Sequence, residues 1–173
     1  MAQIDDVLKN QISALSRLLD VTKVFKNDKE PCEIEEGVFL GSVAAANNRE
    51  FLIRKNVTHI LTVASSIAPA HPNDFVYKII AVADRESTNL KVYFDECFSF
   101  IDEAKRRGGG ALVHCFVGKS RSATIVVAYL MKKRGMTLSQ ALSYVRARRH
   151  QASPNGGFML QLREFESSLR DAS

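Results

Sequence analysis

Cysteine is scarce in this 173-residue sequence, and long apolar runs are absent from it. The three cysteines, Cys32, Cys97 and Cys115, are an odd number without paired spacing, so they indicate neither a disulfide framework nor a zinc site. No apolar run reaches the ~18 residues that would span a bilayer, and the N-terminus lacks the charged-then-apolar pattern of a signal peptide. We therefore expect no membrane span and a reducing compartment, cytoplasmic or nuclear.

The most specific pattern in the chain is the segment His114-Cys115-Phe116-Val117-Gly118-Lys119-Ser120-Arg121-Ser122. It lies between the apolar runs 111–113 and 123–131, which predicts a buried strand, a tight loop and a helix. The backbone N–H groups of residues 116–121 can then line an anion cradle, and the helix that begins near Ser120 points its positive dipole end into it.

Two side chains of this segment carry the chemistry. A cysteine at the mouth of an anion cradle is favoured as the thiolate, which is the nucleophilic form. Arg121, at the far end of the loop, offers a planar fork that matches two phosphate oxygens at once. The segment therefore indicates a nucleophile, Cys115, aimed at a bound phosphoryl group.

Strands and helices are expected to alternate along the rest of the chain. The apolar patterns predict strands at residues 32–34, 38–40, 59–63, 77–82 and 111–113. They predict helices at 49–55, 90–107, about 120–134 and 156–172, and one that begins at the capping box of Thr137 and Gln140. Such an alternation is typical of a layered α/β domain with a largely parallel sheet.

Phosphoryl transfer to a thiolate releases an alkoxide or phenoxide, which needs a proton. The chain should therefore supply a carboxylic acid on a loop. Asp84 fits, because it follows the predicted strand 77–82, at a strand end where loops present functional groups. Glu86 is the second candidate, and Asp74, farther from the motif, is the third.

The nine-residue segment resembles the signature of cysteine-dependent protein phosphatases, and SRSAT after the glycine is similar to that of their dual-specificity branch. The similarity extends to GVFLGSVAAANN, VTHILTVASS, ADRESTNLKVYFDECFSFIDEA and ASPNGGF. It covers about Cys32 to Leu169 and is strongest toward the small plant dual-specificity phosphatases. Two loop positions depart from the commonest pattern: Val117 stands where Ala is frequent, and Lys119 adds a second cation.

The resemblance implies a central, mostly parallel, five-stranded twisted sheet flanked by helices, with an N-terminal helical extension. It also implies that Cys115 forms a phosphocysteine while Arg121 and the loop N–H groups of residues 116–121 hold the phosphate. It implies further that Asp84 acts first as acid and then as base, and that Ser122 hydrogen-bonds the thiolate when it leaves in the second step. No metal or other cofactor is implied.

Two further residues have supporting roles. His114 precedes the nucleophile and is expected to hold the loop by hydrogen bonding rather than to act as a base. Asn155, in SPNGGF, resembles a family position that braces the phosphate-binding loop.

The resemblance also limits the substrate class. The short chain lacks the longer Tyr-bearing recognition segment of tyrosine-specific relatives, which implies a shallow cleft open to phosphotyrosine, phosphoserine and phosphothreonine. The usual substrates of the family suggest mitogen-activated protein kinases. The alternative is a phosphatase of lipid, glycan or RNA phosphates: Lys119 favours it, but Phe116 stands where such relatives usually carry Lys. A catalytically dead phospho-binding module and a non-enzymatic interaction protein are disfavoured by the complete motif.

Charge is distributed unevenly. Up to Glu103 there are 11 Lys/Arg against 16 Asp/Glu, and from Ala104 onward there are 13 against three. Basic clusters lie at 105–107, 132–134 and 146–149, and they fit either solvated helix ends or attraction of a polyanionic partner toward the active-site side. Nucleic acid is not an expected partner, because no aromatic residues interleave with these clusters.

Outside the resemblance, apolar residues from Ile4 to Leu19 recur at helical spacing and predict an amphipathic helix. We divide the chain into this helix with its linker, residues 1–28, and a catalytic domain, residues 29–173. The apolar stripe must be covered by something, either the catalytic domain or a partner. The mildly basic segment from Lys9 to Asn27 is of the kind that calmodulin binds, and Arg17-Leu18-Leu19 would also suit the docking groove of a kinase.

Overall fold

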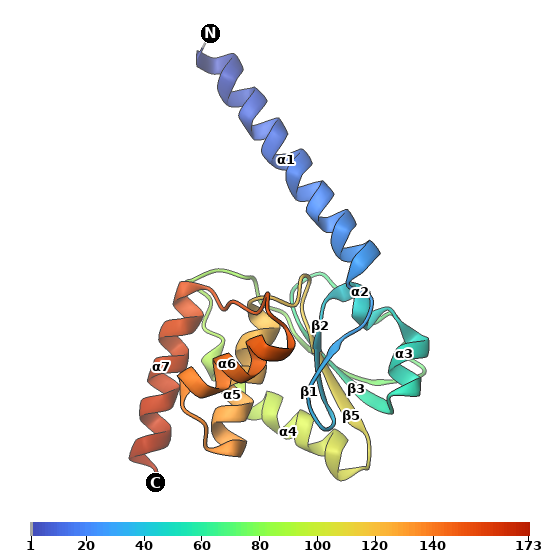
Figure 1. Ribbon diagram of the computed structural model, residues 1–173, viewed down its shortest axis with the longest axis vertical. Helices are drawn as coiled ribbons and strands as arrows, with labels where there is room; N and C mark the ends of the chain where they lie inside the picture. Colours follow the sequence, from blue (N-terminus) through green and yellow to red (C-terminus); the bar gives the residue numbers. More distant parts are fainter. Residues whose placement is uncertain (1) are drawn as a thin grey trace.

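The computed structural model describes residues 2–173, the side chains at positions 2, 3, 20, 21 and 23–25 excepted. Helices and strands alternate after a long first helix (Figure 1). In chain order the elements are α1 (Ala2–Asn27), β1 (Cys32–Glu35), β2 (Val38–Gly41), α2 (Val43–Ala46), α3 (Arg49–Arg54), β3 (Val57–Val63), β4 (Val76–Ile80), η1 (Lys91–Tyr93), α4 (Phe94–Arg106), β5 (Gly110–His114), α5 (Arg121–Arg134), α6 (Leu138–Arg148) and α7 (Gly156–Asp171).

The strands form one five-stranded sheet in the order β1-β2-β5-β3-β4. The pairs β2–β5, β5–β3 and β3–β4 are parallel, and only β1 runs antiparallel to its neighbour β2. This arrangement confirms the predicted fold class, a mostly parallel sheet flanked by helices.

Both faces of the sheet are covered, which explains why its central strands are mostly apolar. On one face, Leu40, Leu61 and Val113 pack in a large core with helices α4, α5, α6 and α7. On the other face, Phe39, Ile60 and Leu112 pack in a smaller core with residues of α2 and α3. Successive strand residues thus serve opposite cores, as the alternating direction of strand side chains requires.

The four parallel strands end at the same edge of the sheet. The carboxyl ends of β2, β3, β4 and β5 lie at Gly41, Val63, Ile80 and His114. In open α/β sheets this edge is where ligands bind, because the loops that follow the strands converge there. The nine-residue motif follows β5, and Asp84 follows β4, so the topology brings both to this edge.

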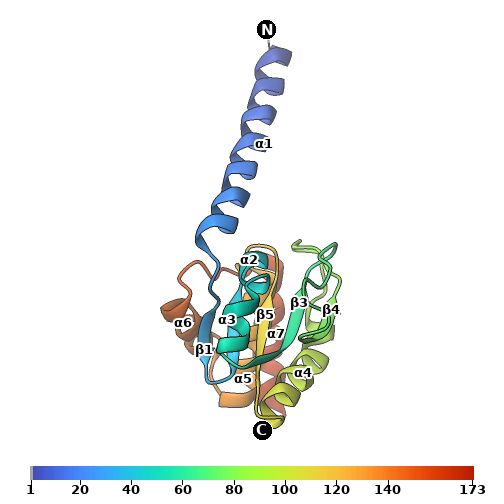
Figure 2. The ribbon, with the colours of Figure 1, turned by 90° about the vertical axis from the view of Figure 1, so that its right-hand side faces the viewer.

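Helix α1 is confirmed as a helix, but its described apolar residues do not pack on the rest of the chain. It extends away from the sheet and its flanking helices in two perpendicular views (Figures 1 and 2). The side chains of the stripe are between 53% and 72% exposed: Ile4, Val7, Leu8, Ile12, Leu15, Leu18 and Leu19. In this structure, the apolar stripe therefore does not dock on the catalytic domain, which was one of the two alternatives. The division at residue 28 stays a prediction.

Some local predictions need correction. The helix expected at 90–107 is a 3-10 turn, η1, followed by α4, and the short helix α2 was not predicted. Strand β4 ends at Ile80 rather than Val82, because its partner strand β3 ends opposite it at Val63 and the N–H of Val82 turns back to the carbonyl of Ile80. The carbonyl of Val82 accepts from Ser65 N–H and from Arg121 Nη1. Across residues 2–173, none of the helices combines the length and the apolar character that crossing a bilayer requires.

His114, the last residue of β5, is buried at 1% exposure. Its Nε2 lies 2.8 Å from Thr62 Oγ1 on the neighbouring strand β3, and its Nδ1 lies 3.2 Å from the carbonyl oxygen of Cys115. Burial lowers the pKa of His114 to about 4, so the imidazole is neutral near pH 7. A neutral ring with both nitrogens engaged fits the predicted role of a loop support rather than a base.

This burial predicts a pH dependence of folding stability. The pKa of His114 is about 4 in the folded chain and ordinarily about 6.5, so between these values the unfolded chain binds more protons. The contribution is present above pH 6.5 and is lost as the pH falls toward 4. Between pH 7 and pH 5, the free energy of unfolding of the wild type should fall by about 2 kcal/mol more than that of His114→Asn, measured by urea denaturation. Parallel pH curves would contradict the assigned neutral, buried state.

Candidate active site

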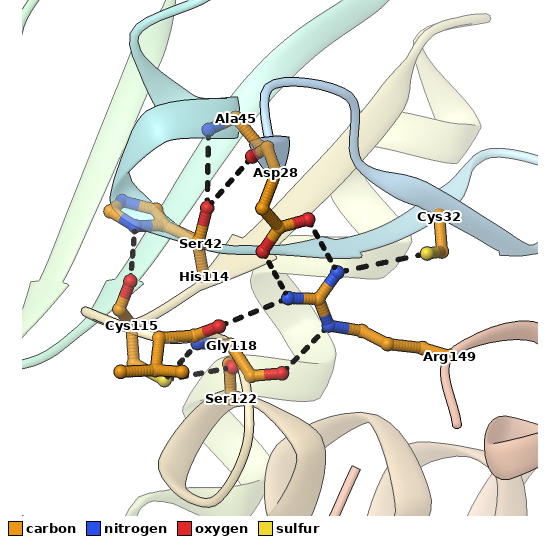
Figure 3. A network of polar contacts seen from close by, with 10 residues as sticks. Asp28, Cys32, Ser42, Ala45, His114, Cys115, Gly118, Ser122 and Arg149 are labelled. Atoms are coloured by element: carbon orange, nitrogen blue, oxygen red, sulfur yellow. Dashed lines mark hydrogen bonds and ion pairs between the residues drawn. The ribbon is translucent and has the colours of Figure 1, made fainter. Parts of the chain in front are cut away.

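The chain leaves β5 at His114, turns through residues 115–120 and enters α5 at Arg121. This is the strand, loop and helix that the sequence predicted. Cys115 is 2% exposed, and its Sγ accepts a hydrogen bond from the N–H of Gly118 at 3.2 Å. The Oγ of Ser122, in the first turn of α5, lies 3.0 Å from the same sulfur (Figure 3). Two groups of the motif are therefore directed at the sulfur, in addition to the positive end of α5.

The carbonyl groups of the phosphate-binding loop, which we define as residues 116–121, bond outward. The carbonyl of Phe116 accepts from Val43 N–H at 3.1 Å, and that of Lys119 accepts from Ser153 N–H at 2.7 Å. Because the N–H and C=O of a trans peptide point in opposite directions, outward carbonyls direct the N–H groups of the following residues inward. The loop thus has the geometry of an anion cradle.

Gly118 is required by two features of this loop. Its φ is +71°, in the left-handed region that residues with a Cβ seldom adopt. A Cβ at this position would also overlap the backbone of Gly41 and lie 2.7 Å from Nη2 of Arg149. The loop is therefore packed tightly against the end of β2 and against Arg149.

Arg121, the first residue of α5, lies next to the loop that follows β4. Its Nη1 donates to the carbonyl of Val82 at 3.0 Å. Its Nε is buried, and no acceptor for it exists among the described residues. Since a buried donor without a partner is costly, this N–H is a candidate for binding an oxyanion in the cradle.

Asp84 is joined to the phosphate-binding loop through Asn155. The Nδ2 of Asn155 donates to Asp84 Oδ1 at 2.9 Å, and the backbone N–H of Asn155 donates to Ser120 Oγ at 3.0 Å. The Oδ1 of Asn155 caps α7 by accepting from Phe158 N–H at 2.9 Å. Asp84 itself is exposed on its loop. Asn155 thus fixes the acid loop and the phosphate-binding loop relative to each other, which fits the bracing role that the sequence suggested.

The two other acid candidates are placed differently. The Glu86 carboxylate lies against Gly156 in the first turn of α7, where a Cβ on that glycine would be 2.7 Å from Oε1. Asp74 forms a two-bonded ion pair with Arg49, with both distances 2.9 Å. The hydrogen bond from Arg49 holds the pKa of Asp74 below its ordinary value, which makes Asp74 a poor proton donor near neutral pH.

Two of the three basic clusters lie away from the active-site side. Lys132–Arg134 lies at the C-terminal end of the 14-residue helix α5, about 20 Å from the phosphate-binding loop at its start. Lys105–Arg107 lies at the end of α4, just before β5 begins at the opposite edge of the sheet. Several of these cations are paired, since Lys105 and Arg134 both bind Glu35. The positions of these two clusters therefore fit solvated helix ends, the first of the two alternatives.

Arg149, assigned from the sequence to the third basic cluster, is instead buried at 1% exposure. It bonds to the phosphate-binding loop and to Asp28 (Figure 3). Sequence reasoning missed both residues. The available signal was weak: an Arg within a run of three at a helix end, and an Asp in a polar linker.

No group of three or more His, Cys, Asp or Glu side chains within the described part of the chain could hold a metal ion. What the site does contain is a cysteine sulfur at an anion cradle, an arginine N–H that has no acceptor among the described residues and a carboxylate on the adjoining loop. Together these groups can perform attack on a phosphoryl group and protonation of the oxygen that leaves.

Comparisons with known proteins identify a family of phosphatases. The family described as dual specificity phosphatase, catalytic domain, matches residues 38–168. The chain is 61% identical over 166 residues to dual specificity protein phosphatase 1 of Arabidopsis thaliana, covering 96% of this chain and 84% of that protein. It is 60% identical over 148 residues to dual specificity protein phosphatase 1B of the same plant, covering 86% of this chain and 89% of that protein.

A solved structure shares the fold. The crystal structure of human DUSP28 superposes with a TM-score of 0.78 at 32% sequence identity, covering 81% of this chain and 95% of the other. The chain therefore belongs to the dual specificity phosphatase family and is a phosphoric monoester hydrolase of that family.

Proposed function

We propose that this enzyme dephosphorylates phosphotyrosine and phosphoserine or phosphothreonine in proteins through a phosphocysteine on Cys115. The observation that carries the proposal is the position of Cys115 Sγ, 3.2 Å from the N–H of Gly118 and 3.0 Å from Ser122 Oγ. A sulfur in contact with a backbone N–H and a hydroxyl at the mouth of an anion cradle is placed for in-line attack on a bound phosphoryl group.

In the first step, Sγ of Cys115 attacks phosphorus, so an S–P bond forms and the P–O bond to the substrate breaks. The inward N–H groups of residues 116–121 and the guanidinium of Arg121 hold the three other phosphate oxygens, where negative charge gathers. Asp84 gives its proton to the leaving oxygen.

In the second step, water attacks the phosphocysteine and gives a proton to the carboxylate of Asp84. The S–P bond breaks, inorganic phosphate forms and the thiolate returns. The hydroxyl of Ser122, 3.0 Å from the sulfur, can donate to this leaving thiolate. His114 and Asn155 keep the loop and the acid in place and take no proton.

A phosphatase of lipid, glycan or RNA phosphates is the second candidate, and the exposed Lys119 is the observation that favours it. Comparing peptides that carry phosphotyrosine or phosphothreonine with vesicles of phosphatidylinositol phosphates separates the two. We expect turnover of both peptides, little turnover of the vesicles, and no turnover of either by Cys115→Ser with an unchanged melting temperature. Faster turnover of the vesicles than of the peptides would reject a protein phosphatase.

The assignment of Asp84 as the acid is tested by how the loss of activity in a variant depends on the leaving group. Asp84→Asn should lower kcat/KM for a phosphopeptide about 10²–10³-fold, because an alkoxide needs the proton. The loss should be much smaller for p-nitrophenyl phosphate, whose leaving group needs little protonation. Glu86→Gln is the matched control and should leave both substrates unaffected. If Glu86→Gln gives the loss and Asp84→Asn does not, the acid is Glu86.

Mitogen-activated protein kinases are the substrates that we propose, from the usual substrates of the family. Arg17, with Leu18 and Leu19 each 63% exposed on α1, suits an acidic docking groove with apolar pockets. A cytoplasmic or nuclear location fits such substrates and fits the free thiol of Cys115.

We also propose calmodulin as a partner of α1, because the exposed apolar stripe is flanked by Lys9, Arg17 and Lys26. Full-length protein should bind calmodulin in calcium and release it in a chelator, and Leu8→Asp with Leu15→Asp should abolish binding. Ser13→Asp, which adds one charge between these positions, is the control. Turnover of p-nitrophenyl phosphate should stay unchanged in all variants. Calmodulin binding that does not depend on calcium would exclude this partner. So would binding of the Leu8→Asp, Leu15→Asp variant as tight as that of the wild type.

A further inference from the structure

The buried guanidinium of Arg149 is the most unusual charged group in the described residues. Its side chain has no exposed surface, whereas Arg148, one residue earlier, is exposed and lies over the ring of Tyr144. Taking a guanidinium out of water costs several kcal/mol unless its donors are satisfied and its charge is compensated. The groups that hydrogen-bond to Arg149 therefore indicate which part of the structure its burial stabilises.

Two of these partners belong to the phosphate-binding loop. Nε of Arg149 donates to the carbonyl of Gly118 at 2.7 Å, and Nη2 donates to the carbonyl of Val117 at 3.0 Å (Figure 3). Each carbonyl shares a peptide plane with the next N–H, so these bonds turn the N–H groups of Gly118 and Lys119 toward the inside of the loop. The N–H of Gly118 is the one that contacts Cys115 Sγ.

Asp28 aims and neutralises this arginine. Its Oδ1 and Oδ2 lie 3.1 Å and 2.6 Å from Nη1 and Nη2 of Arg149, the two-bonded geometry of a carboxylate on a guanidinium. The backbone carbonyl of Asp28 accepts from Ser42 Oγ at 3.0 Å, and Ser42 caps α2 through the N–H of Ala45. Asp28 is thereby fixed although it directly follows the end of α1 at Asn27.

The carbonyls of the phosphate-binding loop thus accept hydrogen bonds from different parts of the chain. Backbone N–H groups hold the carbonyls of Phe116 and Lys119, at the two sides, while Arg149 is the one partner of the middle two among the described residues. Without Arg149, the carbonyls of Val117 and Gly118 would lose these hydrogen bonds, and the two peptides that flank Cα of Gly118 could turn over. Peptide reversal here would place a carbonyl, not an N–H, in front of the anion.

We propose that Arg149, aimed by Asp28, is a positioning residue that holds the phosphate-binding loop in its anion-binding form. This proposal rests on the proposed function in one respect: it takes residues 116–121 as the site that binds phosphate. Asp28 then works with the catalytic unit, although it lies 121 residues from Arg149 in the chain and next to α1.

The test measures tungstate, a phosphate-like oxyanion, binding to full-length Cys115→Ser protein by calorimetry, so that no turnover is needed. Asp28→Asn and Arg149→Lys should each weaken tungstate binding about tenfold at a temperature where circular dichroism shows a fully folded chain. Arg148→Lys is the matched control and should bind like its parent. Since Asp28→Asn leaves Arg149 in place, it decides the question even if Arg149→Lys does not fold.

Non-additivity provides the second readout. If the two residues act as one unit, the double variant should lose little more tungstate affinity than the weaker-binding single variant. A lowered melting temperature with unchanged tungstate affinity would assign both residues a merely structural role and overturn the proposal. Failure of the wild type to hydrolyse phosphopeptides would instead overturn the proposed function, and it would leave the tungstate result standing.

Discussion

The site depends on one constraint: the peptides between Cys115 and Arg121 must present N–H groups inward and carbonyls outward. A peptide loop has no intrinsic preference for this arrangement, and inward N–H groups repel one another until an anion binds. The chain maintains it by giving the outward carbonyls fixed partners from β2–α2, from the segment before α7 and from Arg149. The sheet supplies the frame for these partners, because its parallel strands end at one edge.

Local patterns were sufficient to predict the centre of the site. The strand, loop and helix around Cys115 are contiguous in sequence, so apolar runs and a nine-residue motif specify them together. Asp84 could be placed near them because it follows a parallel strand, and Asn155 provides the bond that joins its loop to Ser120. The roles of these residues in catalysis stay predictions, whereas their arrangement is now described.

Residues that act through distant contacts could not be predicted in this way. Arg149 and Asp28 are 121 residues apart, and neither periodicity nor a motif distinguishes a buried arginine from its solvated neighbours. The contact of Arg121 with the carbonyl of Val82 also depends on where β4 ends, which the apolar pattern placed two residues too late. For helix α1, the spacing of apolar residues predicted the helix and its apolar face. The same spacing carries no information about what covers that face.

The most direct measurement is rapid-quench mass spectrometry of the wild-type enzyme during turnover of a phosphotyrosine peptide. The covalent mechanism predicts one phosphoryl group on the peptide that contains Cys115, formed and lost at rates compatible with steady-state turnover. It should be absent from the peptides that contain Cys32 and Cys97. Full turnover with no phosphorylated Cys115 peptide at any quench time would contradict the mechanism and would point to direct attack of water on the substrate.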